Sequence, residues 1–160
     1  KRRLLLTNLI VLVTFAVVML RYGFDIGWIA LQEAVTYMHA LVFMLGAAYT
    51  LKRNGHVRVD IFYRKFSPRG QALVDLLGAL LLLVPVAVFI FWESWAYVAA
   101  SWAVLEGSRE AGGLPAVFLL KSLIPAFALL LLVQALADGL RDLATLLGQT
   151  PAPTTMGRGA

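Results

Sequence analysis

Four long runs of apolar residues dominate the hydrophobic pattern of this 160-residue chain. They cover residues 4–20, 28–51, 73–92 and 116–137, and only a few ionisable side chains interrupt them. A helix rises about 1.5 Å per residue, so about 20 apolar residues cross the roughly 30 Å hydrocarbon core of a bilayer. The pattern therefore predicts an all-α integral membrane protein with four transmembrane helices.

The segment between the second and third runs predicts a short amphipathic helix over about residues 56–66. Its apolar side chains recur at helical spacing and share one face, at Val59, Phe62, Tyr63 and Phe66. Charged residues occupy the other side, at Arg58, Asp60, Arg64 and Lys65. Such a helix is expected to lie in the headgroup region of the membrane, and the alternative is a plain solvated loop.

Capping and breaking residues predict where the helices begin, bend and end. Ser67 and Pro68 are typical of an N-cap and a first helical position, so the third helix should begin there and continue to about residue 100. Pro85 is expected to kink this helix, and Pro125 to kink the fourth.

Glycine and proline also mark the connection to the fourth helix and the end of the chain. Gly112 and Gly113 predict a turn, after which Pro115 starts the last helix. Residues 148–160 are rich in Pro and Thr and are predicted to be disordered, which leaves residues 1–147 as one membrane domain.

The composition excludes a soluble monomeric globule. Hydrophobic residues make up 61% of the chain and charged residues 14%, whereas about a quarter of a typical soluble domain is charged. A chain of this length has too small an interior to hide that excess. Cysteine is absent from the sequence, which excludes disulfide scaffolds, thiol relays, iron–sulfur clusters and zinc–thiolate sites.

The net charge of +5 is unevenly distributed and predicts the orientation of the chain. One side of the predicted membrane domain holds most of the basic residues, which are Lys1, Arg2, Arg3, Lys52, Arg53, Arg58, Arg64, Lys65, Arg69, Arg141 and Arg158. The other side holds Arg21 and Arg109, with Lys121 just inside the fourth run. Because basic loops stay in the cytoplasm, both termini are expected inside.

Two further features agree with this orientation. All four tryptophans fall at the outer side, as in an interfacial aromatic belt; they are Trp28, Trp92, Trp95 and Trp102. The first run follows three basic residues, as a signal peptide would, but it lacks a small-residue cleavage site, so a retained anchor is expected. The basic inner loop should contact anionic lipid through Lys52, Arg53, Arg58, Arg64 and Lys65, and nucleic-acid binding is not expected.

Glu33 is the main ionisable residue inside a predicted span. It shares a helix face with Tyr37, and an ionisable group in hydrocarbon often marks a functional site. One hypothesis makes Glu33 a carrier of protons or cations. The alternative, favoured by its position near the outer interface, is a carboxylate bonded to a tyrosine or to a basic residue of a neighbour.

His39 and Gly46 lie deeper in the same span. Haem ligation by His39 would need a second histidine at the same depth, and the only other one, His56, lies in the inner loop. We therefore expect His39 to form a helix–helix hydrogen bond. Gly46, followed by two alanines, offers a small surface for close approach of another helix.

Lys121, near the start of the fourth span, has several expected roles. Its side chain can extend to the outer interface, or pair with Glu106, Glu110 or a partner protein. The sequence contains no Ser–His–Asp set, metal-binding cluster, phosphate loop or pair of catalytic carboxylates. We predict neither enzymatic activity nor a cofactor or metal, and the spans hold too few polar groups to form a translocation path alone.

Several strings resemble a known family over about residues 1–145. They are Arg21-Tyr22, Leu31-Gln32-Glu33, Phe43-Met-Leu-Gly46-Ala-Ala-Tyr49-Thr-Leu51, His56-Val57-Arg58-Val59-Asp60 and Gly113-Leu114-Pro115, with Pro125 further on. The chain is similar to the small membrane subunit (Q-type, DctQ-like) of tripartite ATP-independent periplasmic (TRAP) transporters. The glycine–alanine stretch, the basic turn and the His-Val-Arg-Val-Asp string are the most specific part.

The resemblance implies that the chain is a subunit of a three-component transporter in the bacterial inner (cytoplasmic) membrane. In that family a soluble periplasmic protein captures an organic acid, and a large membrane subunit moves it with a sodium gradient. The small subunit packs beside the large one as a scaffold without substrate or sodium sites. The expected contacts with the large subunit, or between helices, are Glu33, Tyr37, His39, Gly46 and Lys121, and those with the binding protein are Glu106, Arg109 and Glu110.

Two other functions were weighed. The first is a stand-alone, proton-coupled exporter that works as a homodimer through Glu33; the long basic inner loop departs from such small proteins. The second is a membrane enzyme or haem carrier, which the missing ligands and nucleophiles disfavour.

Overall fold

Every regular element in the described part of the chain is a helix. The computed structural model describes residues 2–52, 63 and 65–148, with side chains from residue 7 onward apart from that of residue 52. The elements are α1 (Arg2–Gly23), α2 (Ile29–Lys52), α4 (Pro68–Gly78), the π-helical η1 (Ala79–Leu83), α5 (Val84–Ala103) and α6 (Val117–Leu146). The prediction of an all-α protein is confirmed.

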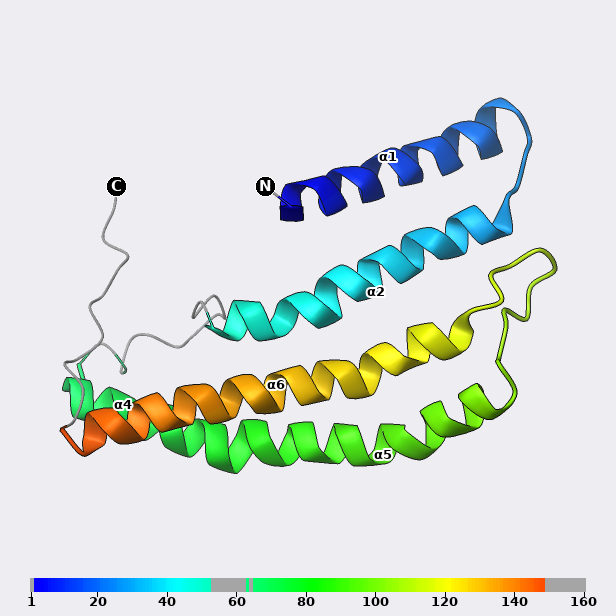
Figure 1. Cartoon of the computed structure of the whole chain (residues 1–160). Helices are drawn as coiled ribbons and strands as arrows, with labels where there is room; N and C mark the ends of the chain where they lie inside the picture. The colour runs from blue at the N-terminus through cyan, green and yellow to red at the C-terminus, as the bar shows by residue number, and fades with distance from the viewer. Residues whose placement is uncertain (1, 53–62, 64, 149–160) are drawn as a thin grey trace, which may run out of the picture.

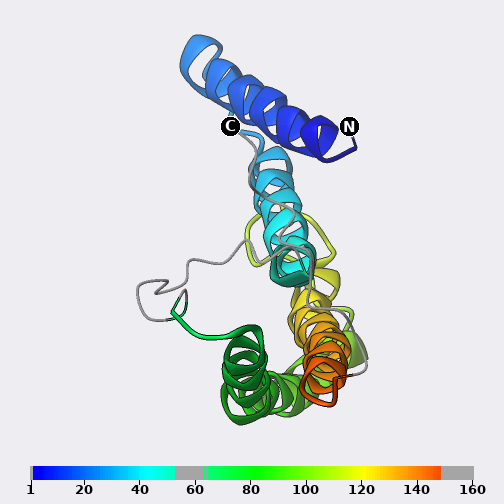
Figure 2. The same cartoon turned by 90° about the vertical axis from the view of Figure 1, so that its left-hand side faces the viewer.

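The helices lie side by side in one row instead of closing into a compact bundle (Figures 1 and 2). Helix α1 packs on α2, α2 packs on α6, and α6 packs on the continuous α4–η1–α5 helix. A row gives each helix one or two neighbours, so both broad faces of the row stay uncovered.

The burial pattern follows from this arrangement. In the described residues the buried hydrophobic side chains are few and mostly small, namely Ile10, Ala72, Ala87, Val98, Ala128 and Ala135. Alanine at helix contacts lets two backbones approach closely, which is how helices associate in lipid. Large apolar side chains point outward instead, and Leu81, Leu82 and Phe89 are each more than 60% exposed.

Three of the helices are long and apolar enough to cross a membrane. They cover Ile29–Leu51, Pro68–Ala103 and Val117–Leu146, with 23, 36 and 30 residues. The segment Thr7–Gly23 of α1 is a shorter apolar helix. The second and third of the long helices exceed the predicted spans 73–92 and 116–137. At about 1.5 Å per residue they measure roughly 54 and 45 Å, so they must tilt or project beyond a hydrocarbon core of about 30 Å.

The predicted start of the third helix is confirmed. Ser67 has extended backbone angles, and its hydroxyl accepts a hydrogen bond from the N–H of Gly70 at 3.2 Å. Pro68 occupies the first turn, where a missing N–H costs nothing. The helix then continues through η1 and α5 to Ala103, close to the predicted end near residue 100.

The two prolines inside the long helices are accommodated differently. Just before Pro85 the chain makes one wider π-helical turn, in which the N–H of Val84 bonds to the carbonyl of Ala79. The ring of a helical proline clashes with the preceding turn, and a wider turn relieves this crowding. Pro125 is buried within α6, which continues on both sides of it.

The predicted surface helix over residues 56–66 falls almost entirely outside the described residues, as do Arg53, Arg58 and Arg64 and the tail beyond residue 148. Tyr63 is described, and its hydroxyl donates to Asp75 Oδ2 at 2.5 Å. The side-chain amide of Gln71 donates to the carbonyl of Tyr63 at 3.2 Å. These bonds tie the segment before α4 to the first two turns of that helix.

The Ser67 cap should contribute measurably to stability. Ser67→Ala removes the acceptor for the Gly70 N–H, and we expect the free energy of unfolding to fall by about 1 kcal/mol. Ser67→Asp, which keeps an acceptor, is the matched control and should stay near the wild type. Unfolding in a sodium dodecyl sulfate titration, with hydrogen exchange of the Gly70 amide, measures both effects. Equal stability of the wild type and the alanine variant would contradict this role.

Candidate functional site at the loop end

Two carboxylates are concentrated at one end of the row of helices. This end, which we call the loop end, carries the 24–28 connection between α1 and α2 and the 104–116 loop between α5 and α6 (Figure 1). Glu33 comes from the second turn of α2, and Glu106 comes from the start of the 104–116 loop. Each is bonded to residues distant in the chain or on another element.

Glu33 fastens the 104–116 loop to α2. The hydroxyl of Ser108 donates to Glu33 Oε1, and the backbone N–H of Leu114 donates to Oε2 at 2.7 Å. The loop is closed on itself at the same point, because the N–H of Ser108 bonds to the carbonyl of Leu114 at 2.9 Å. Both oxygens of Glu33 therefore accept hydrogen bonds from the loop, and its partners differ from the tyrosine or basic residue that the sequence suggested.

The predicted turn at Gly112 and Gly113 is confirmed, and a different structural requirement explains the glycine at each position. Gly112 has a φ of 80°, a region that side chains disfavour. Gly113 lies against the Glu33 contact, since a Cβ added there would stand 2.9 Å from Glu33 Oε1 and closer still to the Ser108 side chain. The turn thus brings the loop backbone within reach of the carboxylate.

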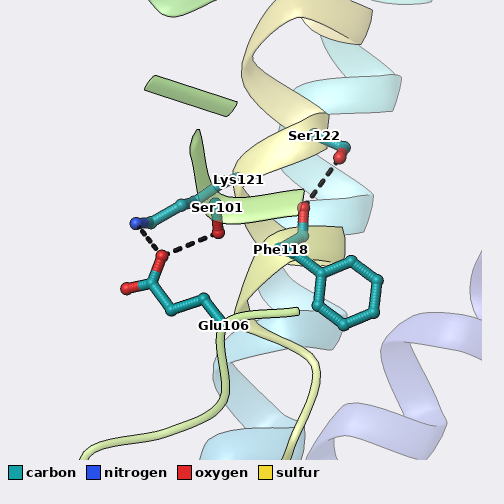
Figure 3. A network of polar contacts seen from close by, with 5 residues as sticks. All are labelled: Ser101, Glu106, Phe118, Lys121 and Ser122. Carbon is teal, nitrogen blue, oxygen red and sulfur yellow. Dashed lines mark hydrogen bonds and ion pairs between the residues drawn. The ribbon is translucent and has the colours of Figure 1, made fainter. Parts of the chain in front are cut away.

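Glu106 forms the second cluster, which joins α5, the loop and α6 (Figure 3). Lys121 Nζ lies 2.5 Å from Glu106 Oε2, and the hydroxyl of Ser101 donates to the same oxygen at 2.7 Å. The Lys121 ammonium also lies 4.0 Å from the centre of the Tyr97 ring, within range of a cation–π interaction. Of the roles expected for Lys121, the structure shows pairing with Glu106.

An aromatic contact holds the start of α6 against the end of α5. The indole N–H of Trp102 donates to Ser122 Oγ at 2.8 Å. The Ser122 hydroxyl in turn donates to the carbonyl of Phe118 at 2.7 Å, as Figure 3 shows. The Trp102 and Phe118 rings meet edge to face, with centres 4.7 Å apart. Together with the Glu106 cluster, this contact fixes where α6 begins.

The electrostatics of Glu106 follow from its neighbours. The Lys121 ammonium and the Ser101 hydroxyl donate hydrogen bonds to the carboxylate and hold the pKa of Glu106 below the usual glutamate value. The side chain of Glu106 is 27% exposed, so water moderates the interaction.

The other predicted residues of α2, namely Tyr37, His39 and Gly46, form none of the hydrogen bonds of this site. The Tyr37 hydroxyl is buried and has no hydrogen-bond partner among the described residues. His39 Nδ1 donates to the carbonyl of Val35 in its own helix at 2.9 Å, and its ring stacks with Phe43 at 6.3 Å between centres. The helix–helix bond expected of His39 is not formed within the described chain. Gly46 has open space where a Cβ would stand.

The charged residues predicted to face a soluble partner are divided by the structure. Arg109 and Glu110 are exposed at the tip of the loop, whereas Glu106 turns its carboxylate toward α5 and α6. On the opposite end of the helices, Lys65 is exposed.

Sequence reasoning missed the residues that complete the two clusters. Ser108 bonds to a carboxylate 75 positions earlier in the chain, and no local spacing indicates such a pair. Ser101 lies five residues before Glu106, a separation typical of neither helix nor strand pairing. The sequence does hold a signal for Tyr97, because it shares a face of α5 with Ser101, which follows one helical turn later.

The chemistry of the loop end suits attachment of the loop better than catalysis. Glu33 and Glu106 are both occupied by donors of the same chain. In the part of the chain that the structure describes, no three His, Asp or Glu residues are grouped to hold a metal ion. The nearby hollow between α5 and α6, about 340 Å³ in volume, is lined mainly by apolar side chains, among them Trp95 and Trp102.

The Glu33 contact should control the mobility of the loop. Glu33→Leu removes both acceptors, so we expect faster hydrogen exchange at the Leu114 amide and faster proteolysis of the 104–116 loop. Glu110→Gln is the matched control, because Glu110 is exposed at the tip and its change leaves both Glu33 bonds intact. Exchange rates at Leu114 that are the same in both variants would show that the contact does not order the loop.

The Glu106 cluster should make stability depend on pH. A carboxyl with a lowered pKa in the folded state stabilises the fold above its unfolded pKa, and this contribution is lost as the pH falls through the folded pKa. Unfolding titrations between about pH 7 and pH 3 cover this range. We expect the wild type to lose more stability toward acid than Glu106→Gln, which has no charge to lose. Parallel pH curves for the two proteins would refute the assignment.

Comparison with known proteins identifies the family of the chain. Residues 10–145 match the model of the family described as tripartite ATP-independent periplasmic transporters, DctQ component. The chain is also similar to a Haemophilus influenzae protein that carries the name of a TRAP transporter small permease protein. The two are 32% identical over 73 residues, which are 46% of this chain and 45% of the relative.

The family match covers most of the chain, including all of α2, α5 and the 104–116 loop. It ends within the last residues of α6. The chain therefore belongs to the DctQ component family of the tripartite ATP-independent periplasmic transporters.

Proposed function

We propose that this chain is the small permease subunit of a TRAP transporter, a non-catalytic scaffold that packs against the large membrane subunit. The complete transporter takes up an organic acid with a sodium gradient after a periplasmic protein has captured it. Membership of the DctQ family supports the transport role. The finer parts of the proposal, namely the partners, the coupling ion and the substrate class, come from the resemblance of the sequence.

The observation that carries the proposal is the single row of helices (Figures 1 and 2). A protein that moves a solute alone must enclose a path between its own helices, with polar groups along it. Here each helix packs on its neighbours in the row, and the buried side chains of the described residues are mostly small, with alanines and serines prominent among them. Such a row has broad uncovered faces, which suit attachment to a larger protein.

The proposed orientation places the loop end at the periplasmic side of the inner membrane and both termini in the cytoplasm. In this orientation α1, α2, the α4–η1–α5 helix and α6 are the four membrane spans. Trp28, Trp95 and Trp102 are all exposed and lie toward the loop end, as an interfacial belt requires, whereas Trp92, also exposed, lies further along α5 from that end. The basic residues of the opposite end then face the cytoplasm and anionic lipid.

The 104–116 loop is the proposed contact with the periplasmic binding protein. Arg109 and Glu110 are exposed at its tip, and the bonds to Glu33 hold its backbone in place. Glu106 is a weaker candidate for this contact, since its carboxylate already bonds to Ser101 and Lys121.

Purification and reconstitution test the proposed function. When the chain is expressed with the other genes of its transporter, we expect it to co-purify with a much larger multi-span protein. Liposomes that contain this chain alone should take up no organic acid and exchange no protons, because the row of described helices encloses no path. An unrelated four-helix membrane protein serves as the control in both assays.

Transport by the isolated chain that disappears in Glu33→Gln would refute the proposal and favour the homodimeric exporter. Co-purification of a second copy alone, without a larger protein, would count against it in the same way.

A further inference from the structure

Helix α2 has two uncovered faces, and their chemistry differs. One face, which we call the polar stripe, carries Gln32, Thr36, His39 and Phe43 at spacings of four, three and four residues. The other face, which we call the leucine stripe, carries Leu41 and Leu45, which are 44% and 41% exposed. The remaining sides of α2 pack on α1 and α6.

Thr36 is unlike the other threonines in the described helices. Thr14 and Thr50 each donate a hydrogen bond to the carbonyl four residues earlier, at 2.7 and 3.1 Å, and so satisfy their hydroxyls within the helix. Thr36 is exposed and forms no such bond with any described residue. A hydroxyl without a partner costs free energy in hydrocarbon, so the exposed Thr36 hydroxyl is available to a hydrogen-bonding group from outside the described chain.

His39, one turn further along, has the same need. Its Nδ1 is occupied by the carbonyl of Val35, which leaves Nε2 as a hydrogen-bond acceptor on the exposed side of the ring. Phe43 stacks on this ring and is itself 71% exposed, so the two rings lie together on the exposed face near the middle of the helix. Lipid chains offer no donor for Nε2.

Gly46 adds an independent observation next to the stripe. No atom lies within 4 Å of the position where its Cβ would stand, so packing within this chain does not require a glycine there. Glycine is a poorer helix former than alanine, and in membranes it allows a second helix to approach closely.

We propose that the polar stripe is the face on which a transmembrane helix of the large subunit docks. Hydrogen-bonding groups of that helix pair with Thr36 and His39 Nε2, its surface accommodates Phe43, and it approaches α2 most closely at Gly46. The leucine stripe faces lipid. This inference rests on the proposed function for the identity of the partner, and on the exposed polar groups of Thr36 and His39 for the choice of face.

Site-directed cross-linking tests the choice of face. Because the sequence contains no cysteine, each variant below carries a single cysteine in this chain. Thr36→Cys and His39→Cys on the polar stripe, with Leu41→Cys and Leu45→Cys as controls on the opposite face of the same helix, each carry a benzophenone maleimide. The co-expressed complex is irradiated in native membranes. We expect adducts with the large subunit in several times higher yield from the first pair than from the second.

The outcomes separate this inference from the function on which it rests. Co-purification of the wild type with adducts mainly from the leucine stripe, or equally from all four positions, overturns the docking face and leaves the proposed function intact. Adducts between two copies of this chain, or with lipid alone, from Thr36→Cys and His39→Cys also overturn it. Failure of the wild type to co-purify with any larger protein overturns the proposed function, and this docking with it.

A substitution series gives a second measurement. Each hydrogen bond lost between membrane helices weakens association about threefold, so Thr36→Val with His39→Phe should reduce recovery of the complex about tenfold. Leu41→Ile with Leu45→Ile is the control and should leave recovery unchanged. Equal amounts of each variant in the membrane fraction show that the chain has folded and inserted. Unchanged recovery of the polar-stripe variant contradicts the inference.

Discussion

Hydrocarbon cannot form hydrogen bonds, and this constraint explains both what the structure contains and what it omits. In lipid an apolar side chain gains nothing by moving to a protein interior, so no large core is needed. Helices can stand in one row and expose leucine and phenylalanine on both faces. Polar groups face the opposite situation, because each one without a partner carries the full cost of its desolvation.

The polar groups of the chain divide according to this constraint. At the loop end, Glu33 and Glu106 are bonded to serine hydroxyls, a backbone N–H and Lys121, and the bonds join the 104–116 loop to α2, α5 and α6. Along α2, Thr36 and His39 Nε2 find no such partners among the described residues. The first group connects the loop and the helices at one end. The second indicates that the row is one part of a larger assembly, as membership of a component family of TRAP transporters also suggests.

The helices could be predicted from the sequence because the features that specify them lie in neighbouring residues. The run of apolar residues, the Ser67 cap and the Pro68 start specify the third helix without any tertiary contact, and the Gly112–Gly113 turn follows from backbone sterics. The ends of the helices were harder to predict from the sequence. Helix α6 continues to Leu146, where it packs on α4, and so extends beyond the length that a membrane requires. The wider turn before Pro85 also escaped prediction, because a kink and a π-helical turn relieve the same clash.

The sequence by itself determined that this is a helical membrane protein of the DctQ type, because hydrophobic length, capping residues and short motifs are properties of neighbouring residues. It also singled out Glu33, His39 and Lys121 as polar groups in apolar surroundings. Only the tertiary structure decided what each of them does: Glu33 holds a loop, Lys121 pairs with Glu106, and His39 is left facing outward. The physical reason is that a hydrogen bond depends on the position of both partners, and here the partners are brought together only when the helices are placed side by side.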